Sequence, residues 1–166
     1  TAIKQSPSSF NSQSSRAVIL FNAEHEKFWT FVAEKLKSYA KDEKSAAKTT
    51  AKMASFAAGV GTVLFFEDLE VIQNLQEQFP SYAENFPVWA EHSTAIAQFA
   101  TWTALHTLGL GASLQHYNPI VDEEVYAEWN VPASWKLRAQ LVFGSVEGEA
   151  KEKGFVDDAV RFKVFK

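Results

Sequence analysis

The segment Gly59–Phe66 constrains the fold most strongly. It is a continuous apolar run of β-branched and aromatic residues that ends at Glu67 and Asp68. Such a run predicts a β-strand that is buried on both faces. Gly59 and Gly61 lack the spacing of a phosphate-binding glycine loop, so we interpret them as residues that delimit the strand. The chain therefore needs other layers of structure on both sides of this strand.

The segment Val88–Leu110 is the longest apolar stretch, and we expect a long helix there. Pro87 is well placed near the start of that helix. Several polar residues argue for a buried helix rather than a membrane span: Glu91, His92, Gln98 and His106. Because the segment is apolar most of the way round, the helix should lie at the centre of a core or of a dimer interface.

The remaining patterns predict one domain over residues 1–166, either α+β or three-layer α/β, with the long helix behind a mixed sheet. Apolar spacing predicts helices at Glu24–Tyr39, Leu69–Phe79 and Val121–Trp129, and strands at Ala17–Phe21, Ala112–Tyr117 and Trp135–Phe143. The alternation in Trp135–Phe143 is typical of a half-buried strand. Lys41–Lys52 fits either an exposed helix or a solvated connector. Val160–Phe165 alternates like a strand that has no neighbouring partner in sequence, so we expect it to join a sheet elsewhere, in another subunit.

Composition excludes several function classes. The net charge of −4 and the absence of a large single-sign block give nucleic-acid binding no electrostatic support. The absence of cysteine excludes disulfides, thiolate catalysis and cysteine-bound metals, and it fits a reducing compartment such as the cytoplasm. The four histidines are too scattered to predict a metal site, and no Ser/His/Asp arrangement is visible. Glu67 and Asp68 fit either an acid/base pair or a solvated helix start.

A polar loop, Ser6–Arg16, runs directly into the strand Ala17–Phe21. After Pro7 it carries five serines together with Asn11 and Gln13. Hydroxyls and amides just before a strand can hydrogen-bond a heterocycle whose edge alternates donors and acceptors. Local chemistry alone fits a connecting turn at least as well.

The sequences of several segments resemble those of the FMN-dependent nitroreductase superfamily, and most closely its Frm2-like branch from fungi and bacteria. Ser6–Arg16 resembles the flavin-contacting loop of that family, and Gly109–Pro119 resembles its second flavin segment. Trp135–Gly144 is similar to the strand that follows in the family. The charged tail resembles the family's closing segment and carries four cations: Lys151, Lys153, Arg161 and Lys163. The resemblance covers essentially the whole chain, in order.

The resemblance implies a three-layer α/β/α fold with a mixed, mainly antiparallel sheet, a long central helix and a C-terminal strand exchanged in a homodimer. It implies an FMN-dependent oxidoreductase that uses NAD(P)H as co-substrate and passes hydride to a nitroaromatic or quinone-like acceptor by a ping-pong mechanism. The flavin N5 atom would carry the chemistry, so no side chain is expected to be catalytic. No nucleic acid, membrane or metal is expected to take part.

The resemblance also assigns cofactor-binding residues. Ser8, Asn11 and Gln13 would hydrogen-bond the flavin ring or its ribityl chain. Leu114, Gln115 and His116 would lie beside the ring. Lys153 and Arg161 are candidates for the phosphate, although a mixed-charge tail fits a solvated segment equally well.

Two further functions remain open, and one of them depends on whether the N-terminal segment that binds the cofactor is present. The family begins with an arginine-rich helix that grips the FMN phosphate, whereas Thr1–Gln5 has the composition of the end of a helix, so we expect an N-terminal helical segment to be missing. One alternative is a flavin-binding redox sensor with little turnover. The other is a structural dimerisation domain without cofactor.

Overall fold

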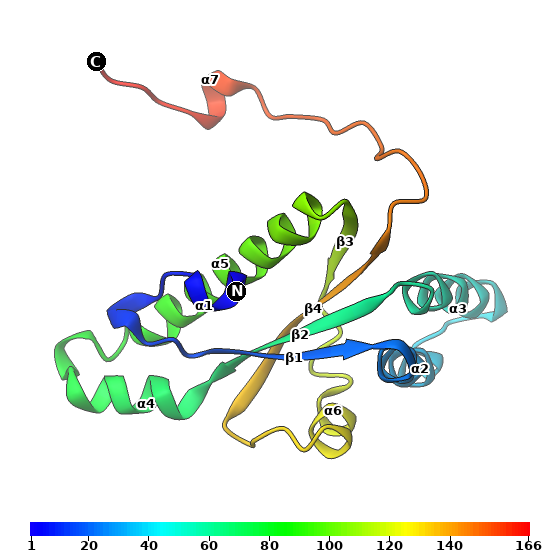
Figure 1. The fold of residues 1–166 in the computed structure, drawn as a ribbon, viewed down its shortest axis with the longest axis horizontal. Coiled ribbons are helices and arrows are strands. Elements are labelled where there is room, and N and C mark those ends of the chain that lie inside the picture. Colours follow the sequence, from blue (N-terminus) through cyan, green and yellow to red (C-terminus); the bar gives the residue numbers. More distant parts are fainter.

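A computed structural model describes residues 1–166 and shows a four-stranded sheet with helices on both faces (Figure 1). The strand order is β1-β2-β4-β3, and all three neighbouring pairs are antiparallel. The strands are β1 (Ser15–Phe21), β2 (Gly61–Asp68), β3 (Leu110–Gln115) and β4 (Trp135–Ser145). The mainly antiparallel character is confirmed, whereas a parallel pair of the expected mixed sheet is not formed within this chain.

The helices confirm the predicted order of elements. The α-helices are α1 (Ala2–Gln5), α2 (Asn22–Lys37), α3 (Glu43–Ala57), α4 (Leu69–Gln78), α5 (Phe86–Thr107), α6 (Asp122–Glu128) and α7 (Asp158–Arg161). Two single turns of 3-10 helix, η1 and η2, cover Ser9–Asn11 and Pro80–Tyr82. None of these helices combines the length and apolar character needed to cross a lipid bilayer.

Strand β2 is the centre of the fold, because all eight of its residues are buried. One face of the sheet packs against α2, α3 and α6, and its core includes Phe28, Trp29 and Leu64. The other face packs beneath α5, and its core includes Val63 and Phe65. The three-layer arrangement predicted for the chain is thereby confirmed.

Strand β4 is more deeply buried than its alternating sequence predicts. Residues Ala139–Phe143 are all buried, although every second position was expected to face solvent. The reason is that β4 pairs with β2 on one side and β3 on the other, while helices cover both faces. The expectation of a half-buried strand is therefore wrong for this part of β4.

Of the two alternatives for Lys41–Lys52, the structure shows the helix, α3. Its start is a capping box, in which the Ser45 amide donates to Asp42 Oδ1 at 2.7 Å and the Ser45 hydroxyl accepts from the Asp42 amide at 3.1 Å. Met53 anchors the helix in the core with 2% of its surface exposed.

The tail after β4 runs clear of the sheet (Figure 1). Its residues from 146 onward are exposed, and α7 forms where the predicted strand Val160–Phe165 begins. The single chain therefore does not form that strand. An extended segment becomes a strand only when a sheet edge pairs with its backbone, and the tail meets no edge within its own chain. Exchange of the tail with a second subunit stays a prediction.

The loop between α3 and β2 crosses β4 so closely that the crossing requires glycine. A Cβ atom on Gly59 would lie 2.8 Å from the carbonyl oxygen of Phe143, and one on Gly144 would lie 3.2 Å from the Cα of Gly59. The Val60 amide donates to that same Phe143 carbonyl at 2.8 Å. Main chain therefore packs directly on main chain here.

Candidate flavin site

The predicted second flavin segment lies at the edge of the sheet. Leu114 and Gln115 end β3, which is an outermost strand, and His116 follows in the loop beyond it. Leu114 and Gln115 are half-buried, whereas His116 is exposed. The Gln115 amide nitrogen donates to the Ser113 hydroxyl at 2.8 Å. These groups can therefore contact a ligand laid along the β3 edge.

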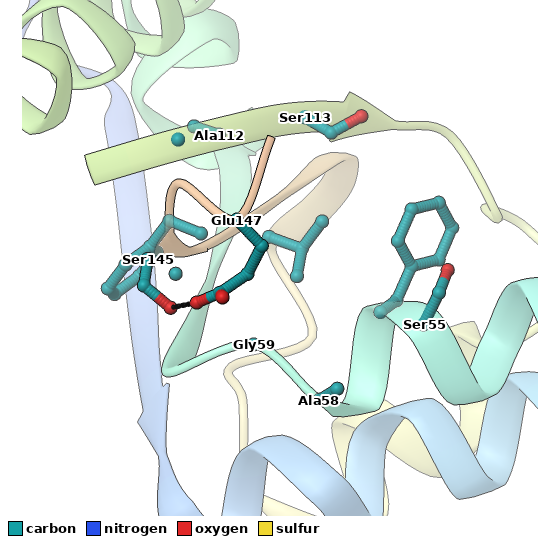
Figure 2. Close-up of a pocket in the computed structure, with 12 residues that line it drawn as sticks. Ser55, Ala58, Gly59, Ala112, Ser113, Ser145 and Glu147 are labelled. Carbon is teal, nitrogen blue, oxygen red and sulfur yellow. Dashed lines mark hydrogen bonds between the residues drawn. The ribbon is translucent and has the colours of Figure 1, made fainter. Parts of the chain in front are cut away.

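A cavity of about 500 Å³ lies beside the start of β3. Figure 2 shows that α3, the α3–β2 loop, β3 and the chain after β4 all contribute to its walls. The labelled lining residues are Ser55, Ala58, Gly59, Ala112, Ser113, Ser145 and Glu147. Most are small, three carry hydroxyls, and Glu147 supplies a carboxylate that accepts a hydrogen bond from Ser145. The walls can accept a flat ring and polar hydroxyl groups, but the single charge among the lining residues is negative.

Lys52 places a cation next to the same segment. Its ammonium nitrogen lies 5.4 Å from the centre of the Phe56 ring and 5.9 Å from that of Tyr117, the residue after His116. Contacts of this kind hold a cation on aromatic faces. The sequence prediction did not single out Lys52. The spacing of Lys52 and Phe56, four residues apart on a helix, was the only local signal.

The first predicted segment, Ser6–Arg16, follows α1 and includes the first two residues of β1. The backbone N–H of Gln13 donates to the Ser8 hydroxyl at 2.9 Å, and this hydrogen bond joins the two ends of a short turn within the loop. Asn11 and Gln13 adopt left-handed backbone conformations, with φ of 50° and 48°, and both side chains are exposed. The loop therefore presents two amides outward while Ser8 is half-buried.

Phe10 anchors this loop in a way that the sequence did not reveal. Its backbone is also left-handed, with φ of 54°, which is rare for an aromatic residue. Its ring contacts four other aromatic rings, with centroid distances from 4.9 to 6.1 Å: Phe79, Tyr82, Phe86 and Trp89. We call these five residues the aromatic anchor. It fixes the loop to α4, η2 and α5, and so offsets the backbone strain.

Glu67 and Asp68 serve the loop and a helix start. Asp68 Oδ1 accepts from the Glu70 amide at 3.3 Å at the start of α4, and Asp68 Oδ2 pairs with Arg16 at 3.0 Å. Glu67 is fully buried, and its Oε1 accepts from the Ser15 hydroxyl at 2.6 Å, while its Oε2 has no partner. Burial raises the pKa of the Glu67 carboxyl above its ordinary value. Of the two alternatives, the structure supports the helix start for Asp68.

His25 belongs to the core. Its Nδ1 accepts from the Thr62 hydroxyl at 2.8 Å, and its Nε2 donates to the Ala57 carbonyl at 3.2 Å. The Trp29 indole donates to the same Thr62 oxygen at 2.9 Å. Burial lowers the pKa of His25, so the imidazole is held neutral. No group of three or more histidine, aspartate or glutamate side chains is arranged to bind a metal ion.

One chain does not bring the predicted flavin segments together. Gln115 pairs with Gln140, which pairs with Leu64, which pairs with Val18, so three strand spacings separate β3 from β1. That is roughly 14 Å across the sheet, and Gln13 lies five residues further along, about 16 Å more. The loop and the β3 end are therefore about 20 Å apart, from the same spacings.

The predicted phosphate ligands lie in the exposed tail. Lys153 Nζ is 5.6 Å from the centre of the Phe155 ring, and the Arg161 guanidinium is 5.6 Å from that of Phe162. Both residues are exposed. Within one chain, the tail that carries them, with α7, lies away from both the loop and the β3 end (Figure 1).

The comparisons with known proteins agree with the fold. The model of the nitroreductase family matches residues 1–145. The nitroreductase FRM2 of Saccharomyces cerevisiae is 37% identical over 95% of this chain and 77% of its own length, and the yeast protein HBN1 is 39% identical over 96% and 78%. Among solved structures, the nitroreductase CinD from Lactococcus lactis in complex with nicotinic acid is 54% identical. That match covers 99% of this chain and 84% of CinD, with a TM-score of 0.92. The chain belongs to the nitroreductase family.

Proposed function

We propose that this protein is an FMN-dependent NAD(P)H oxidoreductase that acts as a homodimer in the cytoplasm and reduces nitroaromatic or quinone-like acceptors by a ping-pong mechanism. The likeness to CinD carries the proposal. CinD has been solved with nicotinic acid, with chloramphenicol and with 4-nitrophenol. The first shares its pyridine ring with the nicotinamide of NAD(P)H, and the other two carry a nitroaromatic ring. Binding of both classes of ring suits ping-pong kinetics, in which the two substrates would occupy one site in turn.

The residues beside β3 fit the ring and the ribityl chain of FMN. Most residues that line the cavity are small, although Phe56, Val142 and Phe143 also line it, and the glycine crossing at Gly59 and Gly144 keeps one wall free of side chains. The hydroxyls of Ser55, Ser113 and Ser145 suit a polyol chain. FMN, when bound, would supply the hydride-accepting and hydride-donating atom.

The phosphate is not matched by charges in the cavity, because the charged lining residue, Glu147, is an acid. Lys153 and Arg161 of the tail are the proposed phosphate ligands, and charge-assisted hydrogen bonds suit that role. They would have to fold back from their exposed positions, which a partner subunit would favour by covering the apolar residues of the tail.

The protein's own residues would orient the ring and tune it. Leu114, Gln115 and His116 would lie along it at the β3 edge. The Lys52 ammonium would stabilise the negative charge that a flavin ring gains on reduction, because a nearby cation favours the charged form. Ser8, Asn11 and Gln13 would hydrogen-bond the ring or the ribityl chain.

The separation of the two segments supports a shared site. A single ring cannot bridge about 20 Å of sheet, so the loop and the β3 end would act on one flavin only if they came from different subunits. Helix α5 presents large exposed apolar side chains that suit such an interface: Ile96, Phe99 and Trp102 are 42%, 71% and 39% exposed.

The central test is a flavin titration of the purified protein, followed by anaerobic addition of NADH or NADPH. We expect FMN to bind and its absorbance band to bleach with either or both nicotinamides, and 4-nitrophenol or a quinone to restore the band. A protein that neither binds FMN nor oxidises NAD(P)H would overturn the proposal. Binding without turnover on any acceptor would favour a redox sensor instead.

A mixing experiment tests the shared site. One variant carries Asn11→Ala and Gln13→Ala, and the other carries Gln115→Ala and His116→Ala. Each alone should be weakly active. After the two are unfolded and refolded together, random pairing makes half of the dimers mixed, and each mixed dimer has one intact site, so about a quarter of wild-type activity should return. If no activity returns, the loop and the β3 end do not serve one flavin from two chains.

A further inference from the structure

Gln140 is a polar residue in the interior of the sheet. It lies in the middle of β4 with none of its surface exposed, and Ala139, Leu141 and Val142 beside it are buried and apolar. Burying an amide in such surroundings costs free energy unless its donors and acceptors are paired. Its hydrogen-bond partners should therefore explain why a polar residue occupies this place.

Those partners are the two residues that follow His116. Gln140 Oε1 accepts from the Tyr117 amide at 2.7 Å, and its Nε2 donates to Asn118 Oδ1 at 3.2 Å. The backbone ladder between β3 and β4 ends at the pair Gln115 and Gln140. The Gln140 side chain thus makes hydrogen bonds just beyond the last backbone pair, and these bonds hold Tyr117 and Asn118 against the sheet.

The position of Tyr117 also affects the Lys52 ammonium. The Tyr117 ring packs edge-on against Trp29, with centroids 5.9 Å apart, and Lys52 lies over its face. Displacement of the Tyr117 backbone would therefore move both the β3 end and the support of the Lys52 ammonium.

We propose that Gln140 is a positioning residue for the flavin: it holds Gln115–Tyr117 against the ring and, through Tyr117, keeps Lys52 beside it. This inference rests on the proposed function. It assigns to Gln140 an effect on cofactor affinity and redox potential that a residue with a purely structural role would not have.

Substitutions separate the two hydrogen bonds. Gln140→Met keeps the length of the side chain but leaves the Tyr117 amide and the Asn118 side chain without their partner. Gln140→Glu keeps the acceptor for Tyr117 but loses the donor to Asn118. Val63→Ala is the matched control, because Val63 is 4% exposed and faces the opposite side of the sheet, so its truncation destabilises the fold without removing either hydrogen bond of Gln140.

The test compares these holoenzymes with the wild type by FMN dissociation constant, flavin midpoint potential, kcat, KM for the nicotinamide and thermal unfolding. We expect Gln140→Met to raise the FMN dissociation constant about tenfold, which corresponds to about 1.4 kcal/mol, and to lower the potential. Gln140→Glu should retain tighter FMN binding than Gln140→Met if both fold. Val63→Ala should lower the melting temperature while affinity and potential stay at the wild-type values.

Three outcomes decide the inference. If the wild type fails to bind FMN, the proposed function fails and the role of Gln140 fails with it. If the wild type binds but the Gln140 variants match Val63→Ala in affinity and potential, only the role of Gln140 is refuted. If Gln140→Met does not fold, Asn118→Ala removes one of the two hydrogen bonds from the loop side, and unchanged affinity and potential in that variant would equally refute it.

Discussion

The hydroxyl of Thr62 supports two buried side chains at once, and its removal should be costly. It donates to His25 Nδ1 at 2.8 Å and accepts from the Trp29 indole at 2.9 Å. His25 and Trp29 are each 1% exposed, and Thr62 is fully buried, so water cannot replace the hydroxyl. Thr62→Val keeps the shape of the side chain but leaves both nitrogens without a partner.

The expected loss follows from the cost of unpaired buried groups. Each such group costs about 1–3 kcal/mol. The methyl group that valine adds returns about 0.8 kcal/mol. We therefore expect Thr62→Val to lower the free energy of unfolding by about 1–5 kcal/mol, with a midpoint of about 3 kcal/mol, from the same terms. Thr62→Ser keeps the hydroxyl, loses one methyl group and should cost about 1 kcal/mol.

Urea unfolding, followed by circular dichroism and tryptophan fluorescence at neutral pH, measures both variants. The order wild type, Thr62→Ser, Thr62→Val is expected. In a Trp29→Phe background Thr62→Val should cost less, because one orphaned group is already absent. If Thr62→Val proves as stable as Thr62→Ser, the hydroxyl contributes nothing beyond its volume and the reasoning is wrong.

Three further predictions follow from the site. Burial raises the folded-state pKa of Glu67 above its ordinary 4.5. The wild type should therefore be most stable relative to Glu67→Gln below pH 4.5, and it should lose that advantage as pH rises through the folded-state pKa. Urea unfolding midpoints of the two proteins across about pH 4–8 measure this, and a difference that does not change with pH would contradict it. Lys52→Met should lower the flavin midpoint potential, whereas Lys48→Met, on the same helix, should leave it unchanged; equal shifts, measured by dye equilibration, would remove the special role of Lys52. Phe10→Ala should cost about 1–2 kcal/mol, since the ring is 49% exposed, and should speed proteolysis within Ser6–Arg16. Ile19→Ala, at a residue 56% exposed on β1, is the control, and cleavage at the wild-type rate in Phe10→Ala would show that the aromatic anchor does not hold the loop.

Local patterns predicted two apolar elements, β2 and α5. The apolar run of β2 was confirmed as a strand that is buried along its whole length. The long helix α5 was confirmed as a helix, but a single chain buries only one side of it and leaves Ile96, Phe99 and Trp102 exposed. The loop Ser6–Arg16 was also located correctly between the first helix and β1. The alternation of β4 misled, since polar Gln140 was interpreted as facing solvent whereas its partner Tyr117 lies 23 residues away in sequence.

The features that sequence could not reveal are contacts between distant segments. Phe10 contacts rings of the segment Phe79–Trp89, which lies far from it in sequence, so its role as an anchor depends on tertiary structure. Lys52 comes beside the β3 end in the same way. The tail strand is not formed in the single chain for a related reason: Val160–Phe165 carries the right alternation, but a strand also needs an edge to pair with, and the tail meets neither outer strand of its own sheet, β1 or β3. Its exchange with a second subunit stays a prediction.

The contact of Gly59 with Gly144 limits how this protein can diversify. One wall of the cavity is built from backbone atoms that leave no room for a Cβ, so mutation cannot reshape it by exchanging side chains. In the proposed shared site, selection for a different acceptor would act on the opposite side of the ligand, through side chains that the loop Ser6–Arg16 of a second subunit presents outward. Substitutions thus cannot alter the main-chain side of the pocket, whereas they can alter the side chains on the surface that would close over it.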